Sequence, residues 1–244
     1  MEATLRKTGA LLGKDLKDVV KNPTMLVCCL LPVGFMLFYK NAVGGGMEGE
    51  AAEAFSSMLV SWSLLFTATM VASLATLNAI AEEKEKHTLR TLMLANVRAS
   101  EVVISKSSVA LLAVTVVNAA CFFVAEGQLS WLAPYLVLGL VGALPVVFVS
   151  LVLGLACRDQ MTAGFYSVPV LLVALVPIFG MLSEGAERIA SFSPLGGIYE
   201  LMGLAIEGAL FTEAAVVSLI VTMAWIAAGA LVFAALFRRL ARDN

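Results

Sequence analysis

The chain has 244 residues, of which 60% are hydrophobic and 14% are charged, and its formal net charge is −2. A soluble domain of this length carries about 25% charged residues. The composition therefore excludes an ordinary soluble protein and predicts an integral membrane protein. A net charge this close to zero gives no reason to expect a nucleic-acid partner.

Residues 1–21 predict an amphipathic helix that lies at the membrane surface and turns into the first span at Pro23. Its apolar side chains recur at helical spacing, while Lys14, Lys17 and Asp18 fall off that face. The apolar face consists of Leu5, Leu12, Leu16, Val19 and Val20. A disordered charged tail is the alternative interpretation of this segment.

Six apolar runs then follow with the length that a membrane-spanning helix requires, roughly 20 residues. None alternates with a period of two, and backbone in hydrocarbon must satisfy its own hydrogen bonds, so the runs predict helices and not barrel strands. The runs are 22–39, 55–81, 107–125, 127–157, 160–183 and 214–237. The predicted fold class is an all-α membrane protein with six transmembrane helices, in a single domain that covers residues 1–244.

Lysine and arginine residues are retained on the cytoplasmic side of a membrane and set the orientation of its proteins. Of the 16 such residues, only Lys40 and Arg188 fall on one side of the predicted spans, and the remaining 14 fall on the other. We therefore predict a multi-pass protein with both termini in the cytoplasm.

Residues 189–212 are too apolar for an ordinary exposed loop and too interrupted for a span. Only 11 uncharged residues separate Arg188 from Glu200, and the segment 193–197 contains one proline and two glycines. A re-entrant helical hairpin at 189–212 explains both facts, because irregular backbone is tolerated at membrane depth when it packs against protein. A helix on the outer surface is the alternative.

The sequence shows no energy source of its own. Segment 9–15 differs from a phosphate loop because three residues separate its glycines where four are required, and because Asp15 stands where a Ser or Thr should bind magnesium. No carboxylate lies in the middle of a predicted span, which disfavours an ion-coupled transporter. The single histidine, His87, lies in a charged loop, and the cysteines lack metal-ligand spacing. We expect this chain to be no enzyme by itself and to bind no metal or cofactor.

The most charged segment, residues 82–97, joins the second and third predicted spans. On a helix, Glu82, Glu85 and Lys86 project from one face. The opposite face carries Leu89, Leu92, Met93 and Asn96. Such a helix suits docking on a partner or on the membrane, and it equally suits a solvated extension of the second span, stabilised by pairs such as Glu82 with Lys86.

The segment 83–92, followed by 97–106, resembles the signature of ABC type-2 permeases. The positions in register with that signature are Thr88, Leu89, Leu92, Arg98 and Lys106. The departures are His87 for the usual glycine, Arg90 for a glutamate, Asn96 for a proline and Ser105 for a glycine. The order of the predicted elements is also similar: an interfacial helix, six spans, a charged loop after the second span and a hairpin before the last.

The resemblance implies that residues 82–97 form a coupling helix that docks on a separate ATP-binding subunit. The residues that would transmit the nucleotide-driven movement of that subunit to the membrane helices are Glu83, Glu85, Thr88, Leu89 and Leu92. The substrate pathway would form between two permease halves, mainly from the second and fifth spans. Its candidate lining residues are Ser63, Thr67, Met70, Asn78, Tyr166 and Phe179. Ordinary helix packing is the alternative role for each of them.

The resemblance further implies the membrane subunit of an ABC exporter in the bacterial plasma membrane. Its partners would be two copies of the ATP-binding subunit, which would hold ATP and Mg²⁺, a second copy or homologue of this chain, and membrane lipids. The apolar lining suits a hydrophobic or amphipathic substrate, such as a drug, an antimicrobial peptide or a lipid-like molecule. One alternative is a polysaccharide or glycolipid exporter, although 3 Trp and 4 Tyr are few for a sugar pathway. Another is an ion-coupled secondary transporter.

Overall fold

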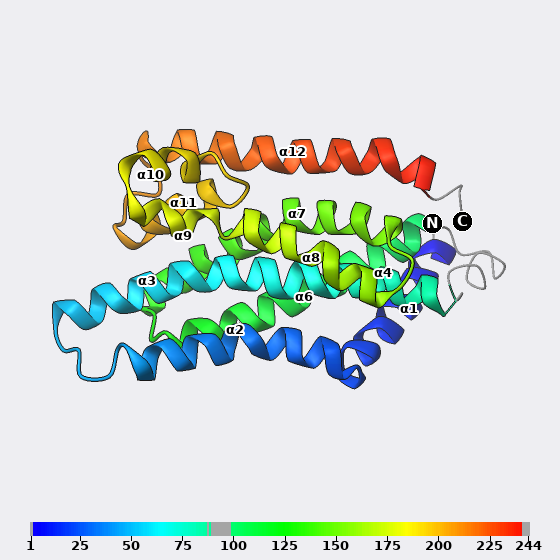
Figure 1. Cartoon of the computed structure of the whole chain (residues 1–244), viewed down its shortest axis with the longest axis horizontal. Helices are drawn as coiled ribbons and strands as arrows, with labels where there is room; N and C mark the ends of the chain where they lie inside the picture. The colour runs from blue at the N-terminus through cyan, green and yellow to red at the C-terminus, as the bar shows by residue number, and fades with distance from the viewer. Residues whose placement is uncertain (1, 87, 89–98, 241–244) are drawn as a thin grey trace.

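The computed structural model describes residues 2–86, 88 and 99–240, and in this part of the chain it contains helices and no strands. Most helices lie along the long axis of the molecule (Figure 1). Helix α1 (Glu2–Lys21) lies at one end, which we name the α1 end. Helix α10 (Glu184–Ser191) lies at the other, which we name the hairpin end.

Helix α1 is followed directly by the first apolar helix, α2 (Pro23–Ala42). Asn22 stands between them and caps α2, because its side-chain oxygen accepts a hydrogen bond from the Thr24 amide at 2.9 Å. Pro23 suits the first position of a helix, where no amide donor is needed. The predicted helix over 1–21 is confirmed for the described residues. Its bundle-facing side differs from the predicted apolar face, because Leu11 and Asp15 are buried while Val20 is exposed.

The second span is one continuous helical segment of 36 residues at the centre of the bundle. It comprises α3 (Glu50–Phe66), a π-helical stretch (Thr67–Ser73) and α4 (Leu74–Glu85). The hydroxyls of two threonines in the wider stretch donate to backbone carbonyls, Thr67 to Ser63 at 2.7 Å and Thr69 to Leu65 at 2.8 Å. The segment packs against α2 and against four later helices. These are α6 (Ala99–Val124), α7 (Leu129–Ala156), α8 (Gln160–Ala174) and α11 (Gly196–Ile206).

The described chain contains five helices that are long and apolar enough to cross a membrane. Besides α2 and the second span, they are α6 (Ala99–Val124), α7 (Leu129–Ala156) and α12 (Ala214–Leu240). A bent pair of shorter helices raises the number to six if the pair is counted as one span. The prediction of an all-helical, multi-pass membrane protein is therefore confirmed at this level.

The predicted fifth span, 160–183, is not a single helix. It is divided into α8 (Gln160–Ala174), α9 (Val176–Phe179) and a 3₁₀ turn at Gly180–Leu182. Pro177 accounts for the break, because it has no amide hydrogen to donate and its ring crowds the carbonyl four residues earlier. The 15 residues of α8 fall short of the length of a full span.

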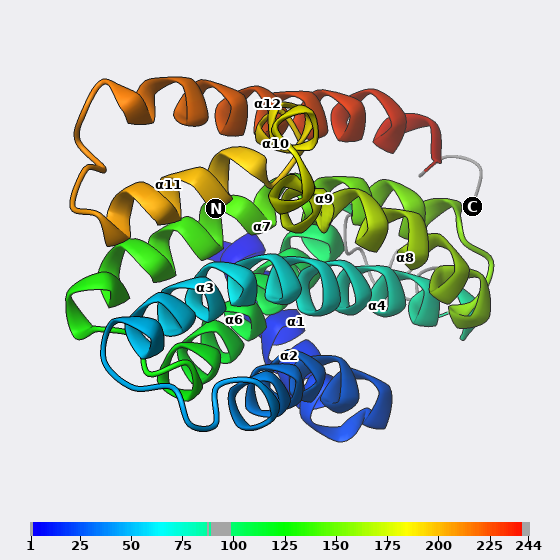
Figure 2. The ribbon, with the colours of Figure 1, turned by 60° about the vertical axis from the view of Figure 1, so that its left-hand side comes forward.

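The bent pair consists of α10 and α11 (Gly196–Ile206), whose axes differ by 103°. A helical hairpin was predicted over 189–212, and its first arm begins earlier, at Glu184. The reason is the cap: the Ser183 hydroxyl accepts a hydrogen bond from the Ala186 amide at 3.2 Å. Helix α11 lies between α7 and α12 (Figure 2).

Candidate functional site

The second span ends in four consecutive polar residues, Glu82, Glu83, Lys84 and Glu85, which we name the hub. One residue turns an α-helix by about 100°. Four in a row therefore point in every direction around the axis of α4. Each of the four bonds to different neighbouring segments, so the end of α4 is tied to the surrounding helices on several sides.

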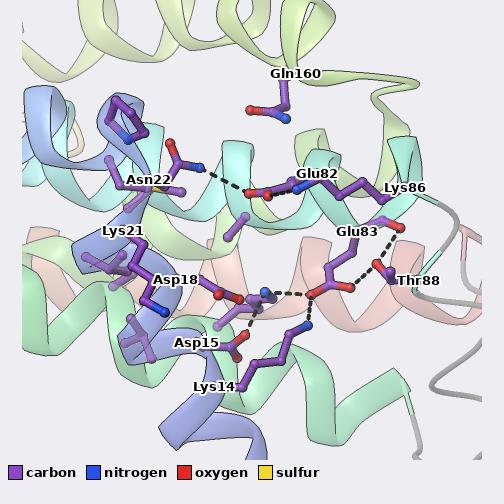
Figure 3. A pocket seen from close by; sticks show the side chains of 18 residues that line it. Lys14, Asp15, Asp18, Lys21, Asn22, Glu82, Glu83, Lys86, Thr88 and Gln160 are labelled. Atoms are coloured by element: carbon purple, nitrogen blue, oxygen red, sulfur yellow. Dashed lines mark hydrogen bonds and ion pairs between the residues drawn. The ribbon is translucent and has the colours of Figure 1, made fainter.

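Glu83, labelled in Figure 3, joins the hub to α1 through Lys14 and to α6 through Lys106, which opens the predicted third span. The Lys106 ammonium lies 2.9 Å from Glu83 Oε1 and 2.8 Å from Asp15 Oδ1. All three side chains are at most 7% exposed. One cation thus lies between two carboxylates from two other helices, and this charge-assisted pairing offsets part of the desolvation cost of burying them.

Further donors surround both carboxylates. Lys14 Nζ lies 3.0 Å from Glu83 Oε1, and the Thr88 hydroxyl donates to Glu83 Oε2. The Ser105 hydroxyl donates to Asp15 Oδ2 at 2.5 Å. Each of the four carboxylate oxygens therefore accepts at least one hydrogen bond, so both side chains are held in fixed positions.

Glu82 joins the hub to the start of α2. Its Oε2 accepts a hydrogen bond from the side-chain amide of Asn22 at 3.2 Å, and its Oε1 accepts one from Lys86. The hydrogen bond to Glu82, assisted by the charge of that carboxylate, raises the pKa of the exposed Lys86 ammonium above its usual value. Lys86 therefore stays charged throughout the physiological pH range.

Lys84 and Glu85 join the hub to α7 and α8 on the opposite side of α4. Lys84 Nζ donates to the Leu155 carbonyl, in the last turn of α7, at 2.7 Å. Glu85 Oε2 accepts from the Gln160 amide at 3.1 Å. The Gln160 amide is one of the unpaired donors at the N-terminus of α8, where a carboxylate is stabilised by the helix dipole.

The predicted coupling residues lie only partly within the described chain. Glu83 and Glu85 belong to the hub, and Thr88 contacts Glu83. Leu89 and Leu92 lie outside the described residues, as does most of the coupling helix predicted over 82–97. Residues 82–86 and 88 of that segment are described, and 82–85 form the end of α4.

The predicted pathway residues do not share one surface. Ser63, Thr67 and Asn78 are buried inside the bundle, and Met70 is half-buried. Tyr166 and Phe179 are exposed, on α8 and α9 respectively. The first group therefore takes part in packing within one copy of the chain, and the second group is accessible from outside it.

Sequence reasoning missed the roles of Asp15 and Lys106. Asp15 drew attention only as a residue that does not fit a phosphate loop, and Lys106 only as a position in the family signature. A usable signal was present for Lys106, which directly precedes the apolar run 107–125 on the same predicted side as the acidic residues of 82–85. Charges buried at such ends require a partner.

A second buried polar group lies deeper in the bundle. Tyr135 is fully buried on α7, and its hydroxyl lies 2.7 Å from Ser63 Oγ and 3.2 Å from Asn118 Oδ1. We expect Tyr135→Phe to lower the free energy of unfolding by about 1–2 kcal/mol, because the Asn118 oxygen loses its donor. A thermal or SDS titration of the purified protein measures this loss. The control is Tyr166→Phe at an exposed position, and equal losses in the two variants would contradict the assignment.

No protein-family model matches this chain, and a comparison with curated proteins gives no match.

Proposed function

We propose that this chain is the membrane subunit of an ATP-driven exporter whose ATP-binding subunit is a separate protein. The observation that supports the proposal is the hub, through which the end of the second span bonds to five surrounding segments: α1, the start of α2, α6, α7 and α8. The hub overlaps the segment 83–92, which together with 97–106 carries the resemblance to ABC type-2 permeases. A partner bound to this stretch would act on the hub first.

A partner needs a rigid connection to move helices through a short segment. Glu83 and Lys106 provide one, because separating buried, hydrogen-bonded charges costs several kcal/mol. A displacement of the segment after the hub is therefore passed to α1 and α6 through Glu83 and to α7 and α8 through Lys84 and Glu85. The bundle would respond as a whole to one point of contact.

The α1 end would face the cytoplasm of a bacterial cell, because most lysines and arginines fall on that side. Two copies of the ATP-binding subunit would dock there, and a second copy of this chain or a homologue would complete the transporter. Tyr166 and Phe179, which are exposed on α8 and α9, would contribute to a pathway between the two copies. A hydrophobic or amphipathic substrate suits such side chains.

The test is a double variant, Leu89→Asp with Leu92→Asp. We expect it to abolish the stimulation of the partner's ATPase activity, because two charges would replace the apolar contacts of the docking face, while membrane insertion is unchanged. ATPase activity of the co-purified complex and membrane fractionation measure the two outcomes.

The matched control places the same type of change at the other end, as Leu129→Asp, an exposed residue at the start of α7. We expect normal ATPase stimulation in this control. Unchanged ATPase stimulation in the double variant would contradict the proposed docking of Leu89 and Leu92 on the ATP-binding subunit. Transport driven by an ion gradient in liposomes that contain this chain alone would exclude the ATP-driven mechanism and favour a secondary transporter.

A further inference from the structure

A cavity of about 610 Å³ lies at the α1 end, between α1, α2, α4 and α6 (Figure 3). Its lining changes character with depth. The floor is formed by small and apolar side chains, among them Ala75, Ala79 and Ala110. The rim carries the exposed side chains of Lys14, Asp18 and Lys21 on α1, whereas the paired charges of Asp15, Glu83 and Lys106 are as buried as the floor. A cavity with a charged rim and an apolar floor fits an amphiphile.

The cavity lies where the apolar part of the second span meets its polar end. Its lining on α4 runs from Ala75, inside the apolar run, to Glu82 in the hub. At 1.5 Å per residue, these positions are roughly 10 Å apart along the helix. This distance matches the 5–10 Å over which amphipathic elements are buried at the headgroup boundary. A membrane lipid can therefore place both of its parts in the cavity.

The charges of the lining indicate which headgroup fits. Four lysines and four carboxylates line the cavity, and six of these eight groups are paired with one another. The other two are Asp18 and Lys21 on α1. In the described part of the chain, neither of these side chains forms a hydrogen bond or an ion pair. One carboxylate and one ammonium thus remain available to a ligand.

We propose that this cavity binds a membrane phospholipid with a zwitterionic headgroup. Lys21 contacts the phosphate, Asp18 contacts the headgroup ammonium, and an acyl chain lies along the alanine floor. Phosphatidylethanolamine has this chemistry. Phosphatidylglycerol offers the phosphate but no cation for Asp18. The assignment is independent of the proposed transport function, because it concerns a resident lipid and needs no partner subunit.

The test is native mass spectrometry of the purified full-length chain, titrated with phosphatidylethanolamine or phosphatidylglycerol of identical acyl chains. Ala79→Phe fills the floor of the cavity, and Ala120→Phe places the same side chain on an exposed face of α6 as the control. Lys21→Gln and Asp18→Asn remove the two free charges. Lys17→Gln, an exposed change on α1 outside the lining, is their control.

We expect the wild-type chain to bind phosphatidylethanolamine about fivefold more tightly than phosphatidylglycerol, the effect of one charge contact at a membrane surface. Asp18→Asn should abolish this preference. Lys21→Gln should weaken the binding of both lipids, and Ala79→Phe should abolish lipid binding. The control variants should bind as the wild type does. Equal lipid binding by Ala79→Phe and Ala120→Phe would overturn the site. A wild-type chain without preference for phosphatidylethanolamine would overturn the headgroup assignment, and the charge variants decide this even if Ala79→Phe does not fold.

Discussion

Lys106→Met is expected to lower the free energy of unfolding by about 3–5 kcal/mol, the cost of removing one partner from a buried ion pair. The ammonium is 7% exposed and lies within 2.9 Å of carboxylate oxygens of Asp15 and Glu83. Without it, both carboxylates would stay buried with too little positive charge beside them. Chemical or thermal unfolding of the purified protein in detergent measures the loss.

The matched control is Lys40→Met, which removes an ammonium that pairs with the exposed carboxylate of Glu126. An exposed pair contributes at most about 1 kcal/mol. Combining Lys106→Met with Asp15→Asn and Glu83→Gln should recover part of the stability, because the orphaned charges are then neutral. Equal stability of Lys106→Met and Lys40→Met would show that the triad makes no special contribution.

Gly197→Ala should destabilise the hairpin end by about 2–3 kcal/mol, the upper range for inserting a methyl group into a filled space. An added Cβ would lie 2.4 Å from the Ser218 carbonyl oxygen and 2.5 Å from Thr222 Oγ1. The first of these atoms belongs to the backbone of α12, so the two helices would have to separate. The unfolding experiments above measure the effect.

Gly203→Ala is the matched control, because it makes the same change in the same helix. An added Cβ at Gly203 would meet no atom within 4 Å. We expect this variant to be more stable than the wild type by about 0.5–1 kcal/mol, since alanine loses less backbone entropy than glycine in a helix. If the two variants changed stability in the same direction, the close approach of α11 and α12 at Gly197 would not be the cause.

Hydropathy alone located the long helices with good accuracy. The predicted run 22–39 corresponds to α2, and the run 214–237 corresponds to α12, because a span needs a minimum apolar length that few other segments reach. The run 160–183 passed the same criterion, yet it is divided at Leu175. A hydropathy criterion counts apolar residues and takes no account of the backbone hydrogen bonds that Pro177 removes, so it does not predict this break.

The connections of the hub were beyond the reach of the sequence. Asp15 and Lys106 are 91 positions apart, and periodicity gives the face of a helix without the identity of its neighbour. The acidic character of residues 82–85 was visible, and the prediction that Glu83 and Glu85 have a special role drew on a resemblance. Their attachment to α6 and α8 emerges only from the packing of the bundle.

The π-helical stretch in the second span fixes the angular phase between the two halves of this helix. A wider turn accommodates an additional residue, and each residue contributes about 100° of rotation and 1.5 Å of rise. Narrowing the stretch to an α-helix would therefore twist every later residue of the segment by a similar angle. Glu83 would swing away from Lys106, and Glu85 away from the start of α8. The alignment at the α1 end thus depends on a backbone irregularity located several turns away, within the apolar part of the protein.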